Sequence, residues 1–128
     1  MSCNGRYSGQ SRYGNTLAPV RIVRFINPVY TTQFVDRESL IDSGASGTMI
    51  PKDIAEKLAL IEIRKSDSYD YEGNFTGRKS VYVVTVSCDN LSHNVEALET
   101  NGIPIIGRDI LNTLQLTLRG PQQRWEMG

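Results

Sequence analysis

The residues best suited to chemistry lie in the stretch 40–50. An apolar pair runs directly into Asp42, which is followed by Ser43 and Gly44. A carboxylate at the end of a buried strand is costly unless it is paired or used, and Gly44 and Gly47 permit backbone conformations that other residues avoid. The stretch therefore predicts a strand that delivers a carboxylate into a tight loop. For Asp42 taken alone, the alternative is a structural role in which it caps the amides of its own turn.

Other kinds of catalytic or metal site find little support. The chain has one histidine, His93, and the sequence places no serine or cysteine beside it, so a Ser-His or Cys-His system is not expected. The two cysteines, Cys3 and Cys88, are distant and make no disulfide framework. We expect free thiols and no metal site. Free thiols would suit a reducing compartment such as the cytoplasm, although two residues do not settle the compartment.

Length and composition fit one soluble domain. The chain has 128 residues, of which 39% are hydrophobic and 22% charged, and its formal net charge is zero. This length allows one modest core, and the neutral balance disfavours nucleic acid as a partner. No stretch approaches the roughly 18 apolar residues of a membrane span. Residues 1–17 are polar and rich in Ser and Gly, which predicts a flexible N-terminal arm; residues 18–128 form the predicted domain.

The elements that must position Asp42 are mostly strands. β-branched and aromatic residues predict strands over residues 20–26 and 29–35, then a polar turn at Asp36 and Arg37 and a third strand over 38–42. Residues 29–42 could form one bent strand or a hairpin, and the sequence leaves both open. A helix is predicted over 51–60, with Ile54 and Leu58 on its buried face. A second short helix is predicted over 108–114, with Asp109 as its N-cap. Further strands are expected over residues 60–63, 81–86, 94–99, 103–107, 116–118 and 122–127.

A long hairpin is predicted around residues 66–79, with its tip near residues 72–74. The segment is polar, contains two glycines and is flanked by strand-like residues. Tyr71 and Phe75 lie beside the tip, where an ordinary hairpin would hide aromatic side chains. This arrangement suggests a flap that closes over a ligand, and a plain exposed hairpin fits equally well.

A second motif, Ile-Ile-Gly-Arg-Asp-Ile-Leu, occupies residues 105–111. Together with residues 40–45 at this separation, it resembles the retroviral-type aspartic proteases, the retropepsin-like family. Members of that family combine an apolar pair and Asp-Ser/Thr-Gly-Ala with a flap hairpin, then an apolar pair, Gly-Arg-Asp/Asn and another apolar pair. The resemblance covers residues 19–128, and the helix at 51–59 favours cellular, bacterial or retroelement members. It implies a mostly β fold, a closed β-barrel with one or two short helices and a flap hairpin.

The resemblance implies roles for the first motif and the hairpin. Asp42 matches the catalytic aspartate. Ser43 matches the residue whose hydroxyl binds across to the partner subunit's loop, and Gly44 the glycine whose carbonyl contacts substrate. Ala45 completes the active-site loop. The residues that match the flap tip are Tyr71, Glu72, Gly73, Asn74 and Phe75.

The resemblance also assigns structural support to the second motif. Gly107 and Arg108 match a turn behind the active-site loop, with Arg108 expected in an ion pair, and Asp109 is expected to be structural. Many viral enzymes have an acidic residue that pairs with this arginine, but position 46 here is serine. The sequence therefore names no partner for Arg108.

The implied mechanism needs two carboxylates, and the chain has one Asp-Ser-Gly. The resemblance therefore implies a homodimer in which one Asp42 comes from each subunit. Two carboxylates about 3 Å apart cannot both ionise, so they share a proton and together activate a water. No metal, cofactor or covalent intermediate is required.

The implied activity is an aspartic endopeptidase acting on an extended polypeptide, with no nucleic-acid partner. The alternative is a catalytically silent retropepsin-like module for dimerisation or peptide binding. We expect the strands over residues 122–127 of the two subunits to pair, with Trp125 in the interface. The apolar residues expected to line the substrate site are Leu60, Ile50, Ile103 and Ile105.

Overall fold

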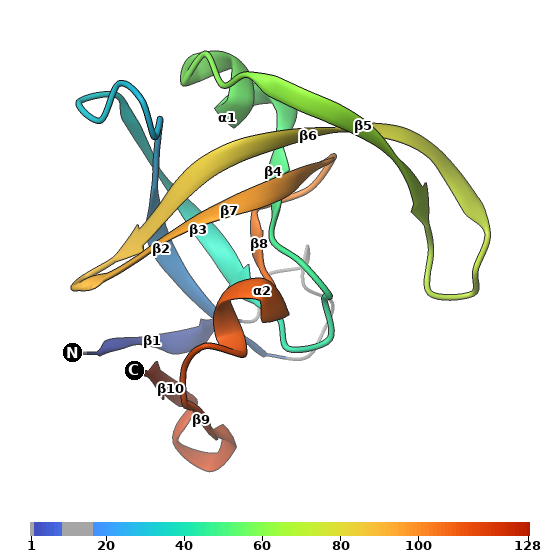
Figure 1. Ribbon diagram of the computed structural model, residues 1–128. Helices are drawn as coiled ribbons and strands as arrows, with labels where there is room; N and C mark the ends of the chain where they lie inside the picture. Colours follow the sequence, from blue (N-terminus) through green and yellow to red (C-terminus); the bar gives the residue numbers. More distant parts are fainter. Residues whose placement is uncertain (1, 9–16) are drawn as a thin grey trace.

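The computed structural model describes residues 2–8 and 17–128 and is mostly β, as predicted (Figure 1). The strands in these ranges are β1 (Cys3–Ser8), β2 (Ala18–Ile26), β3 (Phe34–Ile41), β4 (Met49–Pro51), β5 (Glu62–Tyr69), β6 (Phe75–Cys88), β7 (Leu91–Thr100), β8 (Ile105–Ile106), β9 (Leu116–Arg119) and β10 (Arg124–Met127). The helices are α1 (Lys52–Lys57), α2 (Arg108–Leu111) and a 3-10 turn, η2 (Gly120–Gln122). Neither α-helix in the described ranges has the length and apolar character needed to cross a membrane.

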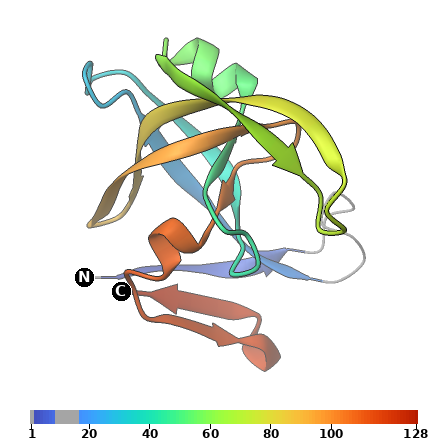
Figure 2. The same cartoon turned by 45° about the vertical axis from the view of Figure 1, so that its right-hand side comes forward.

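The strands form one sheet that closes on itself. Hydrogen-bonded neighbours follow the order β5-β6-β7-β4-β8-β3-β2-β1-β10-β9, and residues 85–87 of β6 also pair with residues 24–26 of β2. This extra pairing joins β2, β3, β8, β4, β7 and β6 into a ring, which confirms the predicted closed barrel. β5 extends the ring on one side as part of the long hairpin. On the other side β1, β10 and β9 form a small terminal sheet, at the bottom of Figures 1 and 2.

Apolar side chains from the ring and both α-helices fill the core. Val23 and Phe25 alternate with exposed neighbours along β2, as expected for a strand with one buried face. Ile54 of α1 is fully buried together with Leu58, which directly follows the helix and lies four positions later on the same face, as the helical spacing predicts. The helices therefore close the barrel rather than form a layer of their own.

The strand predicted over residues 29–35 is wrong at its beginning. Residues 29–32 form a turn, and β3 begins only at Phe34. The cause is the side chain of Asn27, whose Oδ1 accepts hydrogen bonds from the amides of Val29 and Tyr30 at 2.9 and 3.0 Å. Asparagine competes in this way with ladder hydrogen bonds, and β-branched composition alone does not reveal it.

The polar turn predicted at Asp36 and Arg37 is also wrong. Both residues lie inside β3, opposite Arg24 and Val23 of β2. The Asp36 carboxylate pairs with the guanidinium of Arg24 at 2.9 Å, and Arg37 pairs with Asp53 of α1 at 2.8 Å. Charged residues at the solvent side of a strand need no turn when each has a partner.

The flexible arm predicted over residues 1–17 is contradicted over residues 3–8. These residues are β1, which pairs antiparallel with both β10 and β2. The expectation of free thiols is also wrong, because Cys3 forms a disulfide with Cys88, 85 positions away. The signal for both features is non-local, and no pattern within residues 1–17 carries it. Residue 1 and residues 9–16 of the predicted arm lie outside the described part of the chain.

The predicted terminal strand exists as β10, but its expected role in pairing subunits is wrong. β10 already has β1 on one side and β9 on the other within the same chain. Trp125 is only 1% exposed, and its indole lies against Gly5, where a Cβ would come within 2.7 Å of the ring. Trp125 is therefore a core residue, and β9 forms the outer edge of the terminal sheet.

Candidate active site

Asp42 lies directly after β3, where the loop of residues 42–48 begins. β3 runs parallel to β8, with Ile41 opposite Ile106, and the Asp42 amide donates to the Ile106 carbonyl at 3.0 Å. The side chain of Ile41 is buried, whereas Asp42 is half-buried and Ser43 is exposed. The end of a core strand therefore fixes the carboxylate at the protein surface.

Hydrogen bonds between neighbouring residues hold the conformation of the loop. The Gly44 amide donates to Oδ1 of Asp42 at 2.9 Å, and the Ala45 amide donates to the Asp42 carbonyl at 3.2 Å. A Cβ on Gly44 would lie 3.1 Å from the same Oδ1, which is closer than side chains normally approach. Asp42 thus does cap its own turn, and this bond also orients its carboxylate while Ser43 and Gly44 stay exposed.

The second motif packs directly behind this loop. A Cβ on Gly107 would lie 2.4 Å from the carbonyl oxygen of Gly47, so only a glycine fits at this crossing. The next amide, that of Arg108, donates to the Ala45 carbonyl at 2.9 Å. The two motifs, about 65 positions apart in the sequence, therefore make backbone contact.

Asp109 acts as a brace for the loop and is not the N-cap of α2. Gly107 occupies the N-cap position. The Asp109 carboxylate accepts the backbone amide of Thr48 at 3.0 Å and the Thr48 hydroxyl at 2.8 Å. Thr48 is buried and was missed by sequence reasoning. The available signal was that Thr48, a hydroxyl residue, directly precedes the apolar pair Met49 and Ile50, with which β4 begins.

Arg108 contributes through its backbone. Its side chain is exposed, and the ion pair expected for it is not formed among residues 2–8 and 17–128.

The hairpin of β5 and β6 ends in a tight turn over residues 70–74. The Asp70 carboxylate accepts the amides of Asn74 and Glu72 at 2.9 and 3.0 Å, and Gly73 has a φ of +86°, which suits glycine. The hydrogen bond from the Asn74 amide holds the pKa of Asp70 below its usual value. Within this turn, Tyr71 is 96% exposed.

Aromatic rings flank the same tip. Phe75 begins β6 and meets Tyr69 edge to face, with the ring centroids 5.8 Å apart. In both Figure 1 and Figure 2 the hairpin curves over, and its tip hangs on the side of the barrel where the 42–48 loop lies. The hairpin is therefore present as predicted, with exposed aromatic groups at its end.

A hollow of about 320 Å³ separates the Asp42 loop from the base of the hairpin. Its walls come from the loop itself and from β5, β6 and β7. The lining residues are Ala45, Ser46, Gly47, Thr48, Met49, Arg64, Ser66, Val81, Glu96 and Leu98. Two of these lining residues, Arg64 and Glu96, form an ion pair.

The apolar residues expected to line the substrate site do not line this hollow. Ile50 is fully buried in the core, and Leu60 lines a different depression beside residues 27–30. Met49, Val81 and Leu98 supply the apolar surface instead. Because β4 alternates, Met49 faces the hollow when Ile50 faces the core.

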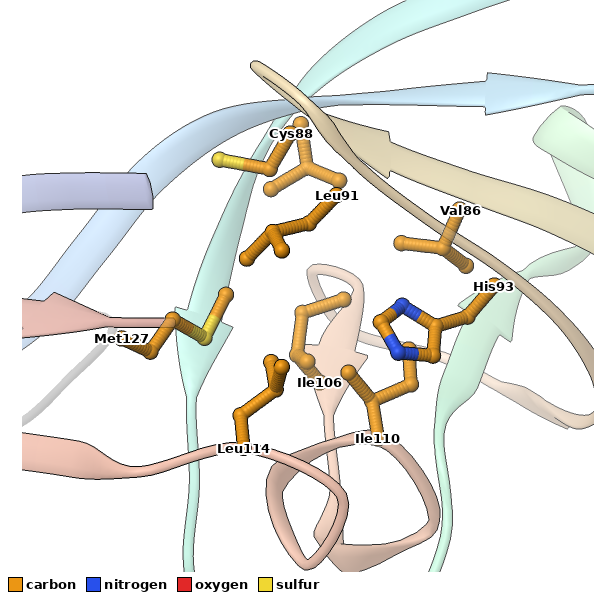
Figure 3. Close-up of a pocket in the computed structure, with 9 residues that line it drawn as sticks. Val86, Cys88, Leu91, His93, Ile106, Ile110, Leu114 and Met127 are labelled. Carbon is orange, nitrogen blue, oxygen red and sulfur yellow. The ribbon is translucent and has the colours of Figure 1, made fainter. Parts of the chain in front are cut away.

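The environment of His93 offers no competing site. Figure 3 shows its ring beside an apolar pocket whose labelled neighbours include Val86, Ile106 and Ile110. The pocket holds about 10 Å³, roughly the space of one water molecule. The ring nitrogen Nε2 lies 3.2 Å from the Thr113 hydroxyl. This histidine therefore belongs to the packing between β7 and α2.

The solved structures that are similar to this chain include three that contain a protease. A retropepsin-like aspartic protease from Rickettsia conorii aligns with a TM-score of 0.61 and 12% identity over 99% of this chain and 91% of its own. EIAV protease, in complex with the inhibitor HBY-793, aligns with a TM-score of 0.51 and 22% identity over 75% of this chain and 86% of its own.

The third is the foamy viral protease-reverse transcriptase in complex with double-stranded DNA, with a TM-score of 0.53 and 16% identity over 77% of this chain. The alignment spans 16% of that much longer chain. No protein-family model and no curated protein sequence matches. Identities of this size identify a fold, and the chain has the retropepsin-like aspartic protease fold.

Proposed function

We propose that this protein is an aspartic endopeptidase that acts as a homodimer, with one Asp42 supplied by each subunit. The observation that carries the proposal is the position of Asp42, which ends a core strand and is oriented by the Gly44 amide. The loop is braced from behind by Gly107 and Asp109. Such rigid support for a surface carboxylate is typical of catalytic groups.

The proposed mechanism uses the two carboxylates as one acid–base unit. When two such loops meet at a two-fold axis, the carboxylates share a proton. The ionised group takes a proton from a water held between them, and the protonated group polarises the scissile carbonyl and passes its proton to the leaving amine. The Ser43 hydroxyls are proposed to donate across the axis and hold the two loops together.

The edge of the terminal sheet supports the proposed dimer. Within the described ranges β9 pairs only with β10, so its other side is an open edge. An open strand edge favours pairing with another chain. We therefore place the contact between subunits at β9 and the Asp42 loops, instead of at residues 122–127.

The substrate proposed is an extended polypeptide lying between the hairpin and the Asp42 loop. Its backbone would form hydrogen bonds like those of an added strand. The hollow beside Met49 and Leu98 would take a substrate side chain, with the Arg64–Glu96 pair at its wall. The exposed rings of Tyr71 and Phe75 would cover the peptide from the hairpin side.

The test compares the wild-type protein with Asp42→Asn. Unstructured polypeptides are incubated with each over an acidic-to-neutral pH series, and products are identified by mass spectrometry. Cleavage by the wild type alone is expected, because Asn cannot take a proton from water. Equal cleavage by both would overturn the proposal, and a dimer that never cleaves would favour the silent module. Light scattering gives the mass, and a strictly monomeric protein that still cleaves would contradict the shared site.

A further inference from the structure

The disulfide joins two residues, Cys3 and Cys88, that the proposed peptidase site does not use. Cys3 is the first residue of β1, and Cys88 is the last residue of β6. Cys3 is fully buried and Cys88 is 7% exposed, next to the exposed turn at Asp89 and Asn90. The bond therefore links the terminal sheet to β6, the strand that starts at the hairpin tip and ends at Cys88.

A guanidinium lies against this bond. Arg21 Nη1 is 3.4 Å from Cys3 Sγ and donates to the Asn4 carbonyl at 2.7 Å. The same guanidinium binds both carboxylate oxygens of Asp89, at 2.9 and 2.7 Å. Asp89 balances the charge of Arg21, but the guanidinium still donates a hydrogen bond to Cys3 Sγ, and such a bond strengthens when the sulfur leaves as a thiolate. Cys3 is therefore the better leaving group of the two sulfurs.

The same cluster is not suited to a metal ion. Cys3, Cys88 and Asp89 offer donor atoms within 4.8 Å of one another. The sulfurs are bonded to each other, however, and the carboxylate already binds Arg21, whose positive charge opposes a cation. Thiol–disulfide chemistry is what this donor set can perform.

Apart from the disulfide, β1 packs against the core through few side chains. Cys3 is the one residue of this strand whose side chain is fully buried, Tyr7 is partly buried against the core, and Gly5 has no side chain to pack. The backbone ladder adds four residue pairs with β10 and three with β2, where Pro19 has no amide to donate. Cys3 thus supplies the deepest side-chain contact of β1 and its covalent link to β6.

We propose that Cys3–Cys88 is a redox-active disulfide, and that its reduction by a dithiol releases β1 from the terminal sheet. A thiolate of the dithiol attacks Cys88 Sγ, forming a mixed disulfide while Cys3 leaves as a thiolate beside Arg21. The second thiol of the reductant then attacks the mixed disulfide and frees Cys88. The protein gains two electrons and two protons, and the dithiol becomes a cyclic disulfide.

Release of β1 changes the surface of the terminal sheet. The edge of β10 that β1 covers becomes open, and Trp125 loses the cover that Gly5 provides. In the homodimer, which rests on the proposed function, this would let redox conditions change how the subunits pair. The release of β1 itself depends only on the fold.

Trp125 is the only tryptophan of the chain, so its fluorescence reports on β1 without any need for activity. The full chain is measured oxidised and after reduction with dithiothreitol, with thiol titration to show that both cysteines are free. We expect the emission to move to longer wavelength and acrylamide quenching to rise, while far-UV circular dichroism keeps the barrel signal and reoxidation restores the spectrum. The Cys3→Ser/Cys88→Ser variant should show the shifted emission without reductant. A fully reduced protein with unchanged emission, or one that loses the whole barrel signal, would overturn the proposal.

The role of Arg21 is tested by the rate of reduction. Arg21→Gln should slow the reaction with dithiothreitol about threefold to tenfold, because the leaving thiolate loses its cation. Arg24→Gln is the matched control, since Arg24 lies on β2 like Arg21 and the change removes its ion pair with Asp36 of β3. The control should react at the wild-type rate. An Arg21→Gln protein that reacts as fast as wild type or faster would contradict this role.

Discussion

Replacing Gly107 by alanine tests whether the second motif positions the catalytic loop. The added Cβ would lie 2.4 Å from the Gly47 carbonyl oxygen and 2.5 Å from its carbon. To reach even 3.0 Å from that oxygen, one of the two backbones must retreat by about 0.6 Å. Neither is free to do so, because the Arg108 amide is bonded to Ala45 and the Thr48 amide to Asp109.

The magnitude follows from this geometry. Overpacking in a well-packed region costs about 1–3 kcal/mol, and the upper part of that range applies because the opposing atoms are backbone. We expect the free energy of unfolding to fall by about 2–3 kcal/mol. Since the loop that must move carries Asp42, peptidase activity should fall by up to about 100-fold, the effect of a misplacement approaching 1 Å.

Urea denaturation measures the stability, and cleavage of an unstructured polypeptide measures the activity. Gly102→Ala is the matched control, because a Cβ there meets no heavy atom within 4 Å. Its unfolding free energy should stay within about 0.5 kcal/mol of wild type. A Gly107→Ala protein as stable as this control would refute the steric argument. Lower stability with full activity would refute the link to Asp42.

Three further predictions concern the loop, the hairpin and the dimer. Thr48→Val removes the hydroxyl bonded to Asp109 and should lower the unfolding free energy by about 1 kcal/mol; an unchanged urea midpoint would show that this bond does not brace the loop. The Asn74 amide holds the pKa of Asp70 below the ordinary value of 3.8, so the tip turn should stay intact above that value and loosen as pH falls through the lower folded pKa. NMR titration of the Asp70 carboxyl carbon checks this, and an ordinary pKa would contradict it. Ser43→Ala should weaken the affinity of the two subunits for each other about tenfold in sedimentation equilibrium. An unchanged affinity would count against a hydrogen bond from Ser43 to the partner subunit.

The parts of the fold that the sequence predicts well are those with local signals. Asp42 and Gly107 stand at fixed positions within apolar motifs, and the structure brings the two motifs into contact. α1 follows from the spacing of Ile54 and Leu58, and the hairpin tip from its glycine and polar residues. In each case a few neighbouring residues contain the physical cause.

The features that sequence reasoning missed depend on residues far apart. β1 is polar, and what keeps it in place is a bond to Cys88 and the ring of Trp125. The brace between Thr48 and Asp109 spans 61 positions. The turn after Asn27 is the exception, since its cause is local and an Asn-Pro pair precedes it. The strand prediction relied on the β-branched residues that follow and did not consider the side-chain hydrogen bond that forms the turn.

The strand order of the barrel also has a consequence for folding during synthesis. The ring and the brace behind Asp42 use residues 18–111, whereas β9 and β10 come after them in the chain. A growing chain can therefore assemble the Asp42 loop before the terminal sheet has all its strands. β1, made early, can pair with β2, but its pairing with β10 must wait for the end of the chain, and such long-range pairing is slow. In the proposed dimer this order separates the two events, so that each subunit builds its own loop before it presents the β9 edge to a second copy.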